Sequence, residues 1–143
     1  MQEPAQGVPY LTAIRTKGSS VNPFFRLMGI SVTGAAEGRA ELSMTVLPSM
    51  HNGVGWLQGG MYTALTDEAM ALALYTVIDP QERIATISES TSYLRGVREG
   101  TIVAVGRVLK KGRRVAFTEG EVYADSEQGE ILARSTAAFA VIT

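Results

Sequence analysis

Asp67 is the residue of this sequence best placed to do chemistry, because it interrupts an apolar helical stretch. At the helical repeat of about 3.6 residues, it shares one stripe with Gly60, Ala64, Ala71 and Leu74. A carboxylate among apolar side chains is costly, and desolvation raises its pKa and makes it a stronger base. We therefore predict a catalytic carboxylate at Asp67. The alternatives are an acid that faces solvent and a structural acid bonded to a loop N–H.

Two adjacent glycines, Gly59 and Gly60, lie in the first turn of the same helical pattern. Backbone N–H groups at a helix start have no partner within the helix, and the positive end of the helix dipole lies there. Without a Cβ in the way, an incoming oxygen can approach these N–H groups, as in an oxyanion hole. Simple packing or a tight turn would also explain paired glycines.

The segment around these residues resembles the signature of the phenylacetic-acid-degradation type of hot-dog thioesterases. It reads Asn52-x-x-Gly55-x-x-Gln58-Gly59-Gly60 and then Leu65-x-Asp67-x-Ala69, where that family carries Asn-x-x-Gly-x-x-His-Gly-Gly and Leu-x-Asp-x-Ala. Every spacing matches, and residues 91–97, 110–117 and 130–141 resemble later strands and a turn of the family. The resemblance implies an enzyme that hydrolyses acyl-CoA thioesters and needs no cofactor.

The resemblance also implies a role for each matching residue. Asp67 matches the catalytic carboxylate, as general base or nucleophile, and Gly59 matches the glycine whose N–H polarises the thioester carbonyl. Asn52 matches a side chain that helps to place water or substrate. Thr86 matches a hydroxyl residue that holds the attacking water, with the nearby Ser88 as the alternative.

One position departs from the family pattern, since Gln58 stands where these enzymes usually carry His. Gln donates and accepts hydrogen bonds but cannot titrate, so it can orient a substrate and cannot transfer its proton. We interpret the only histidine, His51, as an ordinary loop residue. An acyl hydratase would need a His beside Asp67 and is disfavoured. A non-catalytic hot-dog protein that binds acyl-CoA or another ligand is the alternative function.

The predicted site is incomplete in one chain. Gly59 and Asp67 are eight residues apart, which separates their backbones by roughly 12 Å along a helix that rises about 1.5 Å per residue. Two antiparallel helices at a two-fold axis would bring the start of one beside the middle of the other. We therefore expect a homodimer with shared sites, as in the family's edge-to-edge dimer, and its pairing into a homotetramer, a dimer of dimers.

Substrate contacts follow from the chemistry of acyl-CoA. Its phosphates call for basic residues, and the candidates lie before and around the turn at Gly112: Arg95, Arg98, Arg107, Lys110, Lys111, Arg113 and Arg114. A solvated hairpin end is the alternative interpretation. Gly60 and Ser88 are further candidate contacts. Candidates for an apolar acyl channel are Trp56, Met61, Leu65, Tyr93 and Phe24, which core packing would explain as well.

The elements that position these residues are predicted from periodicity and turn residues. Residues 1–20 read as a loosely held arm or a short helix at 10–15, where we expect little function, and 21–143 read as one domain. The domain comprises a helical turn from Asn22-Pro23 to Gly29, strands at 30–33 and 39–46, a helix at 57–77, and strands at 84–94, 101–109, 114–124 and 131–142.

Consecutive strands with short joints are expected to be antiparallel neighbours. A lone helix between two groups of strands buries its face only if the sheet curls round it. The predicted fold class is therefore α+β, a hot-dog fold in which a curved antiparallel sheet of about six strands wraps a long central helix.

Composition narrows the function further. The chain has 143 residues, and its 13 basic and 14 acidic residues leave a net charge of -1, so we expect no nucleic acid partner. The lack of cysteine excludes thiolate catalysis and a disulfide framework, and with a single histidine and scattered acids we expect no metal site. Without a signal-peptide or membrane-spanning pattern, we expect no membrane partner and a cytoplasmic location.

Overall fold

The computed structural model describes residues 7–143, and its elements follow the predicted order. The helices are α1 (Gly7–Lys17), α2 (Pro23–Met28) and α3 (Gly59–Tyr75), with short 3-10 turns η1 (Ser19–Val21) and η2 (Pro48–Met50). The strands are β1 (Ser31–Ala36), β2 (Arg39–Thr45), β3 (Arg83–Tyr93), β4 (Thr101–Lys111), β5 (Val115–Ala124) and β6 (Ile131–Ile142). Each predicted element is confirmed to within a few residues. The first six residues of the predicted arm lie outside this range.

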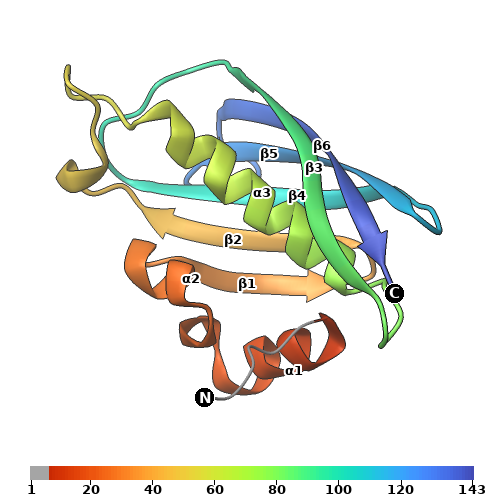
Figure 1. Cartoon of the computed structure of the whole chain (residues 1–143). Coiled ribbons are helices and arrows are strands. Elements are labelled where there is room, and N and C mark those ends of the chain that lie inside the picture. Colours follow the sequence, from red (N-terminus) through yellow and green to blue (C-terminus); the bar gives the residue numbers. More distant parts are fainter. Residues whose placement is uncertain (1–6) are drawn as a thin grey trace.

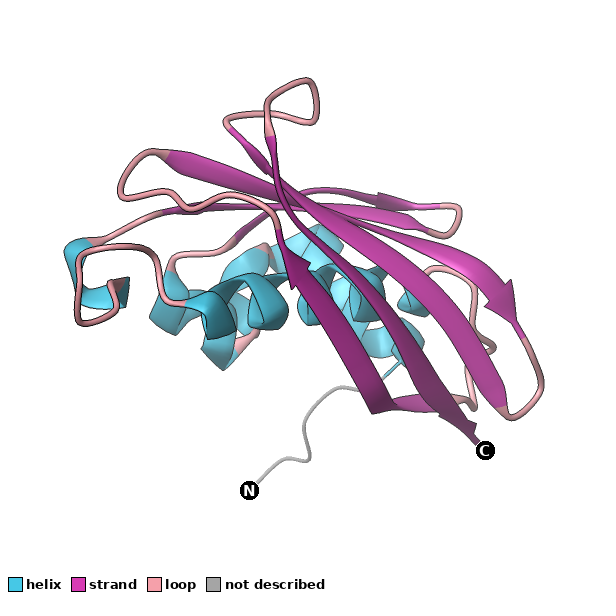
Figure 2. Cartoon of the chain, turned by 90° about the horizontal axis from the view of Figure 1, so that it is seen from above, coloured by secondary structure: helices cyan, strands magenta, loops and turns pink. Residues whose placement is uncertain are grey.

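One six-stranded antiparallel sheet forms the body of the molecule, in the order β1-β2-β4-β5-β6-β3. The sheet curves around α3, which crosses it diagonally (Figure 1). The helices gather against one face of the sheet (Figure 2). The prediction of a long helix wrapped by a curved antiparallel sheet is confirmed.

The expectation that consecutive strands are neighbours is wrong for β3 and β4. β3 pairs with β6, from Arg83 opposite Ile142 to Tyr93 opposite Ala133. β4 already pairs with β2 on one side and β5 on the other, so β3 takes the remaining edge of β6. The chain then crosses through residues 94–100 to the middle of the sheet. β3 is consequently an edge strand, with no second neighbour among the described strands.

Close packing of α3 on the sheet depends on small residues. A Cβ at Gly106 of β4 would lie 2.4 Å from the carbonyl carbon of Ala69, so only glycine allows this approach. The apolar face of α3 that enters the core comprises Tyr62, Leu65, Ala69, Leu72 and Ala73 in the main cluster and Met70 and Leu74 in a second cluster. The predicted stripe runs along the margin of that face, because Asp67 and Ala71 stay partly exposed while Leu74 is buried.

The N-terminal helices cover part of the domain beside β1 (Figure 1). α2 begins as predicted, because Asn22 Oδ1 accepts hydrogen bonds from the backbone N–H groups of Phe24 and Phe25 at 2.9 and 3.2 Å. Leu11 and Ile14 of α1 are buried in the main hydrophobic cluster. The described part of the arm is therefore a packed helix, the second of the two predicted forms. No helix within residues 7–143 is long and apolar enough to cross a membrane.

Candidate active site

Asp67 lies in the middle of α3 and is held by a residue of β3. Thr86 Oγ1 donates a hydrogen bond to Asp67 Oδ1 at 2.9 Å. Burial raises the pKa of Asp67, and the hydrogen bond from Thr86 partly opposes this rise. The carboxylate is thus oriented through one oxygen, and its other oxygen can accept a proton.

Thr86, rather than Ser88, is the hydroxyl residue that contacts Asp67. The pairing of β3 with β6 shifts register between Thr86 and Ser88, which places the two side chains in different surroundings. Ser88 lines a separate cavity together with Leu109 and Phe117.

The start of α3 presents unpaired backbone donors. Gln58 is the N-cap residue, its exposed side chain makes no capping hydrogen bond, and Gly59 is the first helical residue. Within residues 7–143, the N–H groups of Gly59 and Gly60 donate to no acceptor. Both donors lie at the positive end of the helix dipole, which is the arrangement that an oxyanion hole requires.

A cavity of about 340 Å³ at the start of α3, here called the Gly59 cavity, brings four candidate residues of the sequence analysis together: Asn52, Gly59, Tyr93 and Arg95. It is lined by Asn52, Leu57, Gly59, Tyr62, Tyr93, Leu94, Arg95 and Gly96. Asn52 Oδ1 accepts hydrogen bonds at 3.0 Å from the N–H groups of Val54 and Trp56, which orders the loop before α3. In the described range, Asn52 Nδ2 has no acceptor and remains available as a donor.

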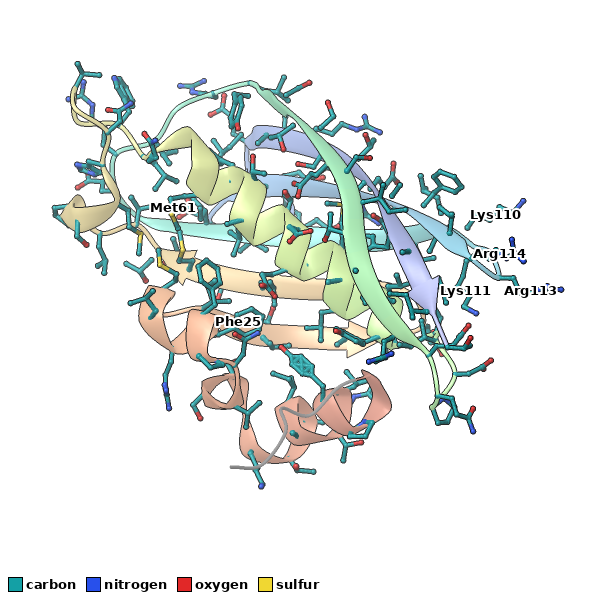
Figure 3. All side chains as sticks on the ribbon, in the orientation of Figure 1. Phe25, Met61, Lys110, Lys111, Arg113 and Arg114 are labelled. Carbon is teal, nitrogen blue, oxygen red and sulfur yellow. The ribbon has the colours of Figure 1, made fainter. Side chains whose placement is uncertain are left out.

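The basic candidates divide into two groups. The first group, Arg95 and Arg107, is paired with carboxylates: Arg95 with Glu130 beside the Gly59 cavity, and Arg107 with Glu121 and Glu127 at 3.3 and 2.7 Å. The second group, Lys110, Lys111, Arg113 and Arg114, gathers at the end of the β4–β5 hairpin, at the opposite end of the sheet from Met61 in the first turn of α3 (Figure 3). Lys111 pairs with Glu82 at 2.8 Å. Arg113 and Arg114 pair with no carboxylate in residues 7–143.

The candidate acyl-channel residues mostly serve other purposes. Leu65 is 1% exposed, and Met61 and Phe24 pack against the same hydrophobic cluster. Trp56 lies beneath the Arg98 guanidinium, 4.1 Å from the ring centroid. Tyr93 lines the Gly59 cavity. His51 Nε2 lies 2.7 Å from the carbonyl oxygen of Arg98, a contact between two loops that agrees with the interpretation of His51 as a loop residue.

Sequence reasoning missed Glu89 of β3, which lies in a network of hydroxyl groups between α3 and the sheet. Its carboxylate accepts hydrogen bonds from Thr66 at 2.8 Å and Thr91 at 3.4 Å. Ser135 lies 2.8 Å from both threonine hydroxyls. Burial raises the pKa of Glu89. The sequence carries one signal for this network: Thr66 interrupts an apolar helix, and the polar residues Glu89 and Thr91 alternate along β3.

Sequence reasoning also missed Glu68, the residue that follows Asp67 on α3. Glu68 lines a cavity of about 310 Å³, here called the Glu68 cavity, to which Tyr10, Tyr75 and Thr86 also contribute. Burial, with a smaller effect of the Asp67 charge, raises the pKa of Glu68 to about 7. Two carboxyl groups with raised pKa values therefore lie side by side on α3.

The chain is similar to known thioesterases in sequence and in fold. Residues 55–131 match the family model described as the thioesterase superfamily. The chain is 22% identical over 111 residues to 1,4-dihydroxy-2-naphthoyl-CoA hydrolase of Listeria monocytogenes, covering 78% of this chain and 90% of that protein. It is 29% identical over 116 residues to human acyl-coenzyme A thioesterase 13, covering 78% and 79%. A phenylacetic acid degradation-related protein of Ralstonia eutropha superposes with a TM-score of 0.81 at 23% identity, covering 92% and 98%, which confirms the predicted fold.

Proposed function

The chain belongs to the thioesterase superfamily, a family of thioester hydrolases, and from this membership we propose that it hydrolyses acyl-CoA thioesters with Asp67 as the catalytic carboxylate. The observation that carries the assignment to Asp67 is its hydrogen bond from Thr86, which holds a half-buried carboxylate of raised pKa at the margin of the core. Two relatives whose names specify CoA thioesters support the choice of substrate.

The proposed reaction begins with the thioester carbonyl oxygen accepting a hydrogen bond from the Gly59 N–H. Asp67 removes a proton from a water molecule, whose oxygen adds to the carbonyl carbon. The tetrahedral intermediate collapses, the carbon–sulfur bond breaks, and CoA leaves as the thiol once it has received the proton. Thr86 orients Asp67 through Oδ1, and Asn52 Nδ2 is the donor proposed to position water or substrate.

A direct attack by Asp67 on the carbonyl carbon, through an anhydride, is the rival route. When water attacks the aspartyl carbon of that anhydride, the oxygen that enters the product comes from Asp67, whereas in the general-base route it comes from water. A single turnover in isotopically labelled water places label in the Asp67 carboxylate only if the anhydride forms. Its absence from the carboxylate supports general-base catalysis.

We propose that each site combines Gly59 and Asn52 of one chain with Asp67 and Thr86 of another. The separation of Gly59 from Asp67, roughly 12 Å along α3 at about 1.5 Å per residue, supports this sharing. β3 supports an edge-to-edge dimer, because it is an 11-residue edge strand and carries exposed Ile87. Leu109 and Phe117, exposed on neighbouring strands, are the apolar surface proposed to pair dimers into a tetramer.

We propose that CoA phosphates contact Arg113 and Arg114, two of the hairpin residues without a carboxylate partner in residues 7–143, and Arg95 beside the Gly59 cavity. Gln58 is proposed to orient the substrate at the helix start through its amide.

The test is hydrolysis of short, long and aromatic acyl-CoA thioesters by the purified protein, followed by release of free thiol. We expect Asp67→Asn to lose at least about a hundredfold in kcat, the scale of a removed general base. Asp79→Asn, a change at an exposed turn residue, is the matched control and should retain activity. If the parent protein binds these thioesters and cleaves none of them, the protein is the binding module that Gln58 leaves open.

A further inference from the structure

Tyr93, the last residue of β3, places its hydroxyl group beside the proposed oxyanion donor. A Cβ built on Gly59 would lie 3.4 Å from Tyr93 Cε1 and 3.8 Å from the Tyr93 hydroxyl oxygen. Both residues line the Gly59 cavity. The rings of Tyr93 and Tyr62 meet edge to face, with their centroids 6.0 Å apart at 70°. The Tyr93 hydroxyl group is therefore held close to a thioester whose carbonyl oxygen binds the Gly59 N–H.

The neighbouring hydroxyl groups decide whether Tyr93 donates or accepts in this cavity. Thr63 Oγ1 of α3 lies 2.9 Å from the Tyr93 hydroxyl oxygen and donates its own proton to Thr91 Oγ1 at 3.1 Å. A threonine hydroxyl group has one proton, so the bond between Thr63 and Tyr93 uses the proton of Tyr93. Among residues 7–143, Thr63 is the only hydrogen-bond partner of this hydroxyl group. The Tyr93 oxygen consequently keeps a lone pair with which it can accept a hydrogen bond from a ligand.

The hydroxyl chain beyond Thr91 keeps this direction because it ends on a carboxylate. Ser135 lies 2.8 Å from both Thr91 and Thr66, and Thr66 donates to Glu89 Oε2 at 2.8 Å. An ionised carboxylate only accepts hydrogen bonds, and bonds to a charged acceptor are the stronger ones. The other near acceptor of Thr66, the Tyr62 carbonyl oxygen at 3.0 Å, favours the same direction. The hydroxyl protons therefore point along the chain, away from the Gly59 cavity.

An acyl-CoA thioester carries a matching donor near its reacting carbon. Its thiol arm contains an amide N–H two carbons from the sulfur atom. When the thioester carbonyl oxygen accepts from the Gly59 N–H, this amide lies only a few bonds from Gly59, the residue against which the Tyr93 ring packs. An acceptor at this place favours a thiol arm that presents an N–H and disfavours an arm that presents an oxygen.

We propose that Tyr93 is a specificity-determining residue, whose oxygen accepts a hydrogen bond from the amide N–H of the substrate's thiol arm. The hydroxyl chain through Thr63 and Thr91 holds Tyr93 in this role and keeps it from acting as a donor. The proposal rests on thioester hydrolysis in the Gly59 cavity and concerns the thiol half of the substrate, independently of its acyl group. The polar network between α3 and β3 thereby has a function beyond packing.

The experiment compares two small thioesters that differ in one group. One is the thioester of N-acetylcysteamine, and the other is that of O-acetyl mercaptoethanol, in which an ester oxygen replaces the amide N–H. Both carry the acyl group that the acyl-CoA panel identifies, or benzoyl if the panel identifies none. We expect the parent protein to prefer the amide by about threefold to tenfold in kcat/KM, the range for a neutral hydrogen bond. The difference should lie in KM, because the bond forms in the ground state and persists in the transition state.

Three variants and one control test the assigned roles. Tyr93→Phe keeps the ring beside Gly59 and should reduce the preference to less than about twofold. Thr91→Val removes the acceptor of Thr63, whose proton then turns to the Tyr93 oxygen, so the amide should lose its advantage or the ester should gain one. Thr91→Ser retains the hydroxyl group and should keep the preference. The control Tyr123→Phe makes the same change as Tyr93→Phe outside the Gly59 cavity and should also keep it.

Each outcome bears on one part of the proposal. Equal hydrolysis of both thioesters by the parent protein, or a preference that Tyr93→Phe leaves unchanged, overturns the role of Tyr93 and leaves thioester hydrolysis standing. A kcat that falls equally for both thioesters in Tyr93→Phe overturns the role as well, because Tyr93 would then serve the reaction and not the recognition of the arm. A preference that survives in Thr91→Val overturns the part of the hydroxyl chain.

Binding separates this proposal from the proposed reaction if the parent protein cleaves neither thioester. Tighter binding of the amide, lost in Tyr93→Phe, supports the assignment of Tyr93 and overturns the catalytic proposal. Equal binding of both members without cleavage overturns both. Thermal unfolding verifies the fold of every variant, and Tyr93→Phe still tests the acceptor if Thr91→Val fails to fold.

Discussion

Replacing Glu68 by Gln should make the protein more stable at alkaline pH and leave its stability almost unchanged in acid. The pKa of Glu68 rises from its ordinary value of 4.5 to about 7 in the folded protein. The folded state therefore binds more protons than the unfolded chain between these values. The resulting stabilisation is fully present below pH 4.5 and is lost as the pH rises through about 7.

The size of the effect follows from the same pKa values. At about 1.4 kcal/mol per pKa unit, the rise corresponds to about 3 kcal/mol, and water in the cavity reduces it. We expect Glu68→Gln to raise the free energy of unfolding by about 1 to 3 kcal/mol at pH 8, where the charge has become costly. Because Asp67 and Glu89 also have raised pKa values, only the difference between variant and parent isolates Glu68.

Urea unfolding of the parent protein, Glu68→Gln and the control Glu37→Gln at pH 4.5 and pH 8 measures this difference. The parent protein and Glu68→Gln should have the same free energy of unfolding at pH 4.5 and different free energies of unfolding at pH 8. A variant that is equally or less stable than the parent protein at pH 8 would refute the reasoning, because Glu68 would then be stabilised as a carboxylate.

Three further outcomes are expected. Thr86→Val removes a hydrogen bond that lowers the pKa of Asp67, so the acid limb of the pH–rate profile should move to higher pH, whereas Thr86→Ser should keep it in place; an unmoved limb in Thr86→Val contradicts the pairing. Replacing Arg113 and Arg114 by Ala should raise KM severalfold for acyl-CoA and leave kcat unchanged, with no effect on acyl-pantetheine thioesters, which lack the nucleotide phosphates; equal effects on both substrates would place the phosphates elsewhere. Gly106→Ala should lower the free energy of unfolding by at least about 2 kcal/mol in urea, because its Cβ would meet the backbone of α3, and a neutral effect would show that the helix can shift.

Local patterns predicted the elements well because each depends on nearby residues. The Asn22-Pro23 start of α2 and the strand alternation after Pro80 are properties of short segments. The place of β3 in the sheet could not be read in this way. Its pairing with β6 joins residues about fifty positions apart, and it depends on which sheet edge remains free.

The candidate site shows the same division. The motif spacing placed Asp67, Gly59 and Asn52 on a helix and its preceding loop, and the structure keeps those positions. The choice between Thr86 and Ser88 was open, because residues two apart on a regular strand share a face. A register shift between Thr86 and Ser88 gives their side chains different neighbours, and the local sequence does not predict this irregularity.

Glu68 could not be recognised from the sequence, since a glutamate beside Asp67 looks like an ordinary solvent-facing helix residue. It becomes partly buried because Tyr10, more than fifty residues earlier in the chain, packs against Tyr75 on the next turns of α3. The cavity is thus a product of tertiary packing between the N-terminal helix and α3.

The most direct test of the shared catalytic site is complementation between two inactive variants. Gly59→Pro removes the proposed oxyanion donor at the first helical position, where proline is tolerated and the Gln58 ψ of 132° suits a following proline. Gly59→Ala retains the N–H and is its matched control. Asp67→Asn removes the proposed base.

Gly59→Pro and Asp67→Asn should each be nearly inactive alone. When equal amounts are unfolded and refolded together, half of the dimers contain one chain of each kind, and one of their two sites is intact. We predict recovery of about a quarter of the parent protein's activity per site in acyl-CoA hydrolysis. No recovery from a mixture shown to contain mixed dimers would contradict a site built from Gly59 of one chain and Asp67 of the other.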